Sequence, residues 1–152
     1  LRRGSVTHTL RHAGFLAAAR ELGMTVTTVE NTGPSSTLSS GYQMARRLFA
    51  APLSQTALFA ASDAVALGAI QAADESGIAI PERLSILGFD NIEYAALPNI
   101  RLSTLSQNTP LLARAAVRLL LELIDSDSRD EYTGKLITPT LVERATCAPP
   151  PC

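Results

Sequence analysis

Apolar positions along the chain follow two spacings that alternate. Apolar residues three and four positions apart predict helices, at Arg11–Leu22, Leu38–Ala50, Ala64–Ser76 and from Thr109 onwards. Short runs of apolar or β-branched residues predict strands, at Met24–Glu30, Thr56–Ala61, Leu84–Phe89 and Leu102–Leu105, followed by an extended segment at Lys135–Ala145. This alternation predicts an α/β fold in which a parallel sheet carries helices on both faces.

Residues with marked backbone preferences place the ends of these helices. Gly23 and Gly77 follow the first and third helices, and glycine readily takes the left-handed conformation that ends a helix. Ser62 and Asp63 supply hydrogen-bond acceptors at the start of the third helix, and Pro110 suits the first turn of the fourth. Asp63 is therefore interpreted first as a helix cap.

Length and charge narrow the class of protein. The chain has 152 residues and a formal net charge of −1, with basic and acidic residues interspersed. One ordinary domain fits this length, and without a cationic excess this chain by itself is not expected to bind DNA. No apolar run reaches the roughly 18 residues of a membrane span, and no signal peptide is recognised. The first residue is Leu1, so we expect a fragment of a longer protein.

The sequence offers no set of residues typical of an enzyme. It lacks the Gly-x-Ser-x-Gly, Walker and Gly-x-Gly-x-x-Gly motifs. No cofactor is expected. A metal site is not expected because His8 and His12 have a metal-ligand spacing but no third ligand. Cys147 and Cys152 stand in a proline-rich tail and are interpreted as inert thiols. Binding without turnover is the better interpretation.

Polar residues follow the predicted strands, where open α/β sheets bind their ligands. These segments are Asn31–Thr37, Ser62-Asp63 and Asp90-Asn91, and Gly4–Thr9 joins them if a strand precedes it. With Arg11 in the first helical turn, the rim offers charge-assisted hydrogen bonds suited to a small polar, hydroxyl-bearing ligand. Structural alternatives stay open: Asp63 as a cap, Asp90 as a turn former and Arg11 as a solvated helix residue.

The segments Phe59–Gly77 and Ile80–Asn91 resemble the lactose/galactose-repressor family of bacterial transcription regulators. Further matches occur in the family's order over nearly the whole chain, at Arg11–Phe15, Gly41-Tyr42, Leu102–Gln107 and Pro139–Arg144. In this family a helix-turn-helix headpiece precedes a two-lobed core related to periplasmic sugar-binding proteins. The resemblance implies that a small molecule, the effector, binds between the lobes, changes their relation and so alters the affinity for DNA.

The resemblance also implies which residues contact the effector from this lobe. They are Arg11, Asp90, Ser62, Gln107, Thr7 and Ser5. Many members of the family place an aromatic ring that stacks on the ligand in the loop before Gly41-Tyr42. The corresponding residue here is Ser36, so no stacking contact is expected from that side.

The resemblance further divides the chain between two lobes of an incomplete two-lobed core. Residues 1–101 and 140–146 correspond to part of the effector-binding lobe, residues 102–139 to a segment that crosses to the other lobe, and residues 147–152 to a tail. The headpiece that contacts operator DNA and most of the other lobe lie outside the match, which begins inside the effector lobe.

The resemblance implies a cytoplasmic homodimer that does not associate with a membrane. The family dimerises through the helix after Ser62-Asp63 and the segment near Ala95–Ile100. The alanine-rich stretch Ala64–Ala73 permits such a contact, although packing on the sheet explains it equally.

An alternative from another class is a periplasmic solute-binding protein for sugar transport, which shares the fold. The stretch Ile80–Asp90 favours the regulator, as does the lack of a recognised export signal. An enzyme is the third and least favoured interpretation.

Overall fold

The computed structural model describes residues 6–31, 37–125, 134 and 136–150. Its elements are α1 (Val6–Glu21), α2 (Leu38–Phe49), β1 (Ala57–Phe59), α3 (Asp63–Glu75), β2 (Ser85–Asp90), the 3-10 helix η1 (Glu93–Ala96), β3 (Ser103–Ser106), α4 (Thr109–Asp125) and β4 (Thr140–Val142). The four predicted helices are confirmed, and α1 begins at Val6 rather than at Arg11. Gly23 and Gly77 both have positive φ angles, as the predicted helix ends require.

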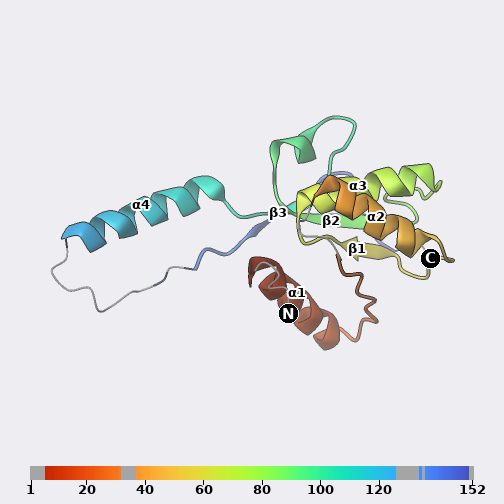
Figure 1. Cartoon of the computed structure of the whole chain (residues 1–152), viewed down its shortest axis with the longest axis horizontal. Coiled ribbons are helices and arrows are strands. Elements are labelled where there is room, and N and C mark those ends of the chain that lie inside the picture. The colour runs from red at the N-terminus through yellow and green to blue at the C-terminus, as the bar shows by residue number, and fades with distance from the viewer. Residues whose placement is uncertain (1–5, 32–36, 126–133, 135, 151–152) are drawn as a thin grey trace.

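The strands form one four-stranded sheet in the order β1-β2-β3-β4. The first three are parallel, with Leu58 opposite Ile86 and Leu87 opposite Ser103, which confirms the predicted parallel sheet. β4 is antiparallel to β3. Figure 1 shows that α4 projects away from the sheet and that the segment before Thr140 leads into β4 beside β3.

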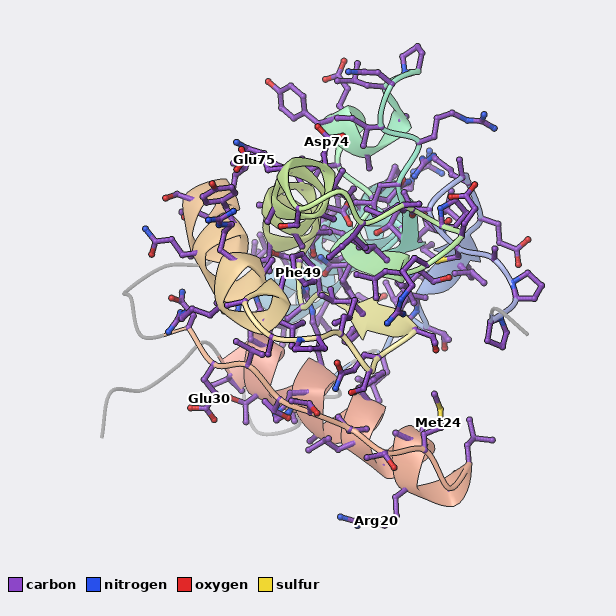
Figure 2. The ribbon with its side chains drawn as sticks, turned by 90° about the vertical axis from the view of Figure 1, so that its right-hand side faces the viewer. Arg20, Met24, Glu30, Phe49, Asp74 and Glu75 are labelled. Carbon is purple, nitrogen blue, oxygen red and sulfur yellow. The ribbon has the colours of Figure 1, made fainter. Side chains whose placement is uncertain are left out.

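The predicted strand Met24–Glu30 is wrong. The segment is extended but belongs to no strand, and Val26 is its only residue that is not exposed. Figure 2 shows it running from Met24 to Glu30 alongside α1. Strand propensity reflects packing on a pleated surface, and β1 pairs only with β2 within the described ranges. The β-branched residues therefore have no ladder to join; Thr27 instead accepts a side-chain hydrogen bond from Gln55.

Small residues let α2 and α3 approach each other closely. A Cβ at Gly68 would lie 2.1 Å from the carbonyl oxygen of Leu38, and one at Gly41 would lie 2.3 Å from that of Val65. Four of the five alanines of α3 are buried within the chain: Ala66, Ala69, Ala72 and Ala73. Packing inside the lobe therefore accounts for this alanine-rich helix, and large residues of the sheet such as Leu84 and Ile86 complete the core.

Helices lie on both sides of β1, as the sequence predicts. α1 lies opposite α2 and α3 in both views of the chain (Figures 1 and 2). Phe15 of α1 stacks on Phe59 of β1, with ring centroids 5.0 Å apart. Ala19 is the residue of α1 that is buried, while Val6 and Leu10 are exposed. The helix is thus held mainly through its middle.

α4 differs from the other helices because it contains no buried residue. Its larger apolar side chains are exposed at Leu111, Leu112, Val117, Leu120, Leu121 and Ile124. Despite this apolar character, no helix of the described ranges is both long and apolar enough to span a membrane. The apolar face of α4 is therefore largely left exposed by the rest of the described chain.

We expect Gly68→Ala to lower the free energy of unfolding by about 3 kcal/mol, because the added methyl group meets backbone atoms of α2 that cannot rotate away. Gly14→Ala is the matched control. Its Cβ has no neighbour within 4 Å, so the variant should be about 0.5–1 kcal/mol more stable than wild type. Urea unfolding followed by circular dichroism measures both. Equal stabilities for the two variants would contradict the close helix contact.

Candidate functional site

Three residues from separate elements meet at the carboxyl end of β2. Asp90 is the last residue of this strand, and its Oδ1 lies 3.1 Å from Nη2 of Arg11 in α1. The Nε2 of Gln107, just after β3, donates to the same oxygen at 2.6 Å. Arg11 also donates through Nη1 to the carbonyl oxygen of Ala61, which follows β1, at 2.6 Å. The ends of three parallel strands therefore share one polar cluster.

Aromatic rings hold Arg11 in place. Its guanidinium carbon lies 3.8 Å from the centroid of the Phe89 ring, within cation–π distance. The Arg11 side chain is only 13% exposed, so the alternative of a solvated helix residue is wrong. Phe15, one turn further along α1, anchors the helix on Phe59. The guanidinium is thereby oriented by contacts within the chain itself.

Of the two residues predicted to cap α3, Ser62 does so and Asp63 makes other hydrogen bonds. Ser62 is the N-cap of α3, and its hydroxyl oxygen accepts from the backbone N–H of Val65 at 3.4 Å. Asp63 is fully buried and points elsewhere. Its Oδ2 accepts from the N–H of Ile92 at 2.9 Å, and its Oδ1 accepts from the Thr104 hydroxyl at 2.5 Å. Reading Asp63 simply as a cap is therefore wrong.

The turn after β2 is held by residues that the sequence analysis did not select. Asp90 has a φ angle of 123° and Asn91 one of 56°. Arg144 donates through Nη2 to Oδ1 of Asn91 at 2.8 Å and through Nη1 to the carbonyl oxygen of Leu102 at 2.7 Å. Asp90 thus forms a turn and also directs its carboxylate to Arg11. A glycine inside an apolar strand, Gly88, was the available signal of a close approach there.

The remaining residues named from the resemblance are not seen in direct contact with Arg11, Asp90 or Gln107. Thr7 is exposed in the first turn of α1. Ser5 and Ser36 lie outside the residues that the structure describes. Arg11, Asp90 and Gln107 are therefore the predicted residues that are in direct contact, with Ser62 beside Ala61 at the end of β1.

Burial raises the pKa of the Asp90 carboxyl above its ordinary value of 3.8, and the negative charge of Asp63 adds to the rise. The Arg11 cation and the Gln107 hydrogen bond lower the pKa without cancelling that rise. The Asp90 carboxylate is thus partly desolvated, and its contacts with Arg11 and Gln107 offset only part of the cost of burial. Such a group gains from an additional hydrogen-bond donor.

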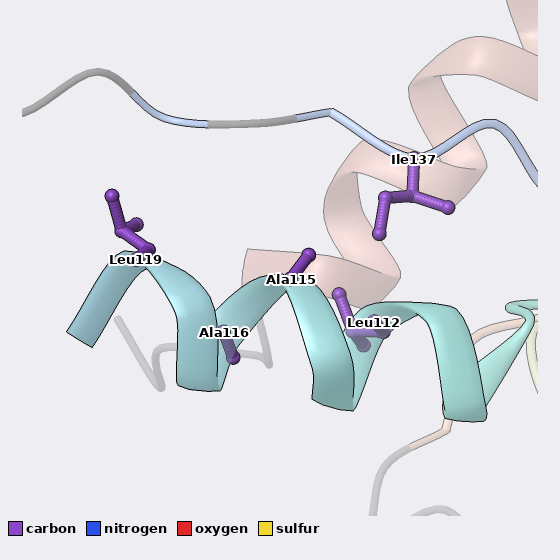
Figure 3. A pocket seen from close by; sticks show the side chains of 5 residues that line it. All are labelled: Leu112, Ala115, Ala116, Leu119 and Ile137. Atoms are coloured by element: carbon purple, nitrogen blue, oxygen red, sulfur yellow. The ribbon is translucent and has the colours of Figure 1, made fainter. Parts of the chain in front are cut away.

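Two shallow hollows lie away from the Arg11–Asp90 cluster. One, of about 160 Å³, is lined by residues of α4 and the returning segment, shown in Figure 3: Leu112, Ala115, Ala116, Leu119 and Ile137. The other, of about 420 Å³, lies between α1 and the extended segment, lined by Leu16, Arg20, Gly23, Met24 and Val26. The first lining is mostly apolar, and in the second Arg20 is the only charged residue among those that line it.

The described residues contain no group of three or more His, Cys, Asp or Glu side chains that could hold a metal ion. Of the histidine pair with metal-ligand spacing, His12 instead lies 3.3 Å from the Thr28 hydroxyl. Cys147 is exposed and free, and Cys152 lies outside the described residues.

Comparison with known proteins identifies the family. The family model of the periplasmic binding protein-like domain matches residues 2–147 of the sequence. The chain belongs to this family. The HTH-type transcriptional repressor PurR of Erwinia tasmaniensis is 35% identical over 141 residues, which are 93% of this chain and 41% of the repressor. The PurR of Pectobacterium atrosepticum is 34% identical with the same coverage.

Solved structures give the same result for this periplasmic binding protein-like chain. A LacI transcriptional regulator from a Rhodococcus species has a TM-score of 0.80 and 32% identity, over 93% of this chain and 52% of the regulator. A LacI family regulator from Enterococcus faecalis, solved with bound ribose, also has a TM-score of 0.80, at 27% identity, over 97% and 52%.

These matches confirm the resemblance to the lactose/galactose-repressor family and favour it over a solute-binding protein for transport. It spans about two fifths of the length of the curated relatives and about half of these solved structures.

We expect Asp90→Asn to gain stability over wild type as the pH rises. The raised pKa means that the folded chain binds the Asp90 proton more tightly than the unfolded chain does. Ionisation of Asp90 therefore lowers the free energy of unfolding as the pH rises from 3.8 towards the raised pKa. The variant cannot ionise, so the difference, variant minus wild type, grows over this interval and is constant above it.

Urea unfolding at a series of pH values measures this difference. Asp74→Asn, at the exposed end of α3, is the control for removal of a carboxylate. A difference between Asp90→Asn and wild type that shrinks with rising pH would show that the Arg11 ion pair outweighs the cost of burial.

Proposed function

We propose that this chain senses a small polar metabolite, a sugar or a related hydroxyl-bearing molecule, for a bacterial transcription regulator. The observation that carries the proposal is the contact between Arg11, Asp90 and Gln107 at the carboxyl ends of three parallel strands, where α/β sheets bind ligands. Support comes from a related LacI family regulator that was solved with bound ribose.

The cluster suits hydroxyl groups for a chemical reason. A hydroxyl can donate to the Asp90 carboxylate and accept from the Arg11 guanidinium, and both bonds are charge-assisted. Gln107 adds an amide that can donate or accept. Because Phe89 and Ala61 already orient Arg11, little side-chain entropy is lost on binding. Ser62, Ser5 and Thr7 are proposed as further ligand contacts.

We propose the lobe division suggested by the resemblance. Residues 1–101 and 140–146 belong to the effector lobe, and residues 102–139 cross to a second lobe that forms the opposite wall of the cleft. Supporting this, α4 has no buried residue and exposes an apolar face, and the related structures are about twice as long as this chain. Burial of that face would contribute about 25 cal/mol per Å².

The regulatory output is proposed to be a change in the relation of the two lobes. An effector shifts that equilibrium only by binding one arrangement more tightly than the other. The complete protein is proposed to be a cytoplasmic homodimer that contacts operator DNA through a separate headpiece, as a two-fold protein reads a two-fold site. The cluster is proposed to bind without catalysing a reaction.

We expect Arg11→Ala and Asp90→Ala, in the complete regulator, to weaken effector binding about tenfold to a hundredfold, because each removes a charge-assisted hydrogen bond. A thermal-shift screen of sugars, beginning with ribose, identifies the effector, and calorimetric titration gives the affinities. Arg20→Ala is the matched control on the same helix, since Arg20 points into solvent (Figure 2). Unchanged affinity in both site variants would refute the assignment.

We expect Leu120→Gln and Leu121→Gln to leave the free energy of unfolding of this chain nearly unchanged, because these side chains are 56% and 55% exposed. Both should reduce binding of a hydrophobic dye and self-association, measured by fluorescence and size exclusion. Leu84→Ala, at 1% exposure, should in contrast cost about 2–5 kcal/mol. A wild-type chain that elutes as a monomer and binds no dye would argue against an uncovered face on α4.

A further inference from the structure

The turn that presents Asp90 has an unfavourable backbone conformation. Asp90 and Asn91 have positive φ angles, 123° and 56°, a region that non-glycine residues rarely adopt. Such conformations persist only when surrounding contacts hold them, and they concentrate at functional sites. The contacts that hold this turn therefore matter for where the Asp90 carboxylate points.

Asp63 holds the turn from inside the lobe. Its fully buried carboxylate accepts the backbone N–H of Ile92 at 2.9 Å and the Thr104 hydroxyl at 2.5 Å. It also fills the space beside Gly88, where a Cβ would lie 2.2 Å from its Oδ1. A buried carboxylate is stable only with such partners. Asp63 thus joins the start of α3 to β3 and to the residue after Asn91.

Arg144 holds the same turn from the other end of the chain. It binds the Asn91 side chain with Nη2 and the Leu102 carbonyl oxygen with Nη1. Its own backbone N–H donates to the Ser103 hydroxyl at 2.9 Å, which fixes its position beside β3. Two successive residues of the turn, Asn91 and Ile92, therefore each have a partner from a distant element.

We propose that Asp63 and Arg144 are positioning residues, which keep residues 90–92 in the conformation that directs the Asp90 carboxylate to Arg11. The inference deepens the proposed function and rests on it for the statement about ligand affinity. Neither residue needs to touch the ligand. Their effect on binding passes through the direction of the Asp90 carboxylate.

The first test observes Arg11, which neither substitution touches. The guanidinium N–H signals of Arg11 in an NMR spectrum of this chain report its position between Phe89 and Asp90. We expect Arg144→Met and Asp63→Ala to shift and broaden these signals while the amide signals of β1 stay in place. Asp63→Asn should restore the wild-type spectrum, because its amide can accept from Ile92 and donate to the Thr104 oxygen. Asp74→Asn is the control for lost charge.

The second test measures the affinity of the complete regulator for D-ribose, the probe seen in a related regulator. Arg144→Met should weaken binding about tenfold, whereas Thr104→Val, which leaves the bond to Ile92 intact, should lower the melting temperature but not the affinity. Wild-type Arg11 signals in both Arg144→Met and Asp63→Ala would overturn the proposal, as would signals that move only together with those of β1. If the wild-type complete regulator binds neither D-ribose nor any other metabolite of the thermal-shift screen, the proposed function fails, and the Arg11 signals still decide the positioning roles.

Discussion

The hydrogen bonds of one buried carboxylate, Asp63, connect the parts of the molecule on which the site depends. They link the start of α3 to Thr104 in β3 and to Ile92 after the turn. Burial of a charged group costs several kcal/mol unless it is paired or hydrogen-bonded, so these partners must be in place whenever the lobe is folded. The lack of a side chain at Gly88 leaves room for the carboxylate. The geometry around Asp90 follows from this connection.

The polar cluster around Asp90 lowers the stability of the fold. Asp90 is partly buried, its backbone has a positive φ angle, and its pKa is raised mainly by burial. Each of these properties costs folding free energy, and the contacts of Asp90 with Arg11 and Gln107 offset part of that cost. Functional sites commonly keep such unfavourable features. A ligand hydroxyl that completes the hydrogen bonding of the cluster would recover more, which couples ligand binding to the stability of the lobe.

The helix pair α2 and α3 is packed far more completely than α4. α2 and α3 are in backbone contact through Gly41 and Gly68, and residues of both helices belong to the hydrophobic core. α4 has an amphipathic sequence, but none of its residues is buried in the described chain. The LacI transcriptional regulator from a Rhodococcus species that this chain matches is about twice as long, and the second lobe proposed above would cover the leucines of α4.

The sequence by itself determined the features that arise within a few residues. Helix ends followed from caps and glycines such as Ser62 and Gly77, and the parallel strands followed from short apolar runs. The rule that parallel strands end at one edge placed Asp90 at the rim, and the resemblance to the family added Arg11. Only the tertiary structure decided the rest. The β-branched segment 24–30 forms no strand because a strand needs a neighbour, whereas Asp63 and Arg144 acquire their roles from partners dozens of residues away. Propensity is a local property, but burial and pairing depend on which distant groups the fold brings together.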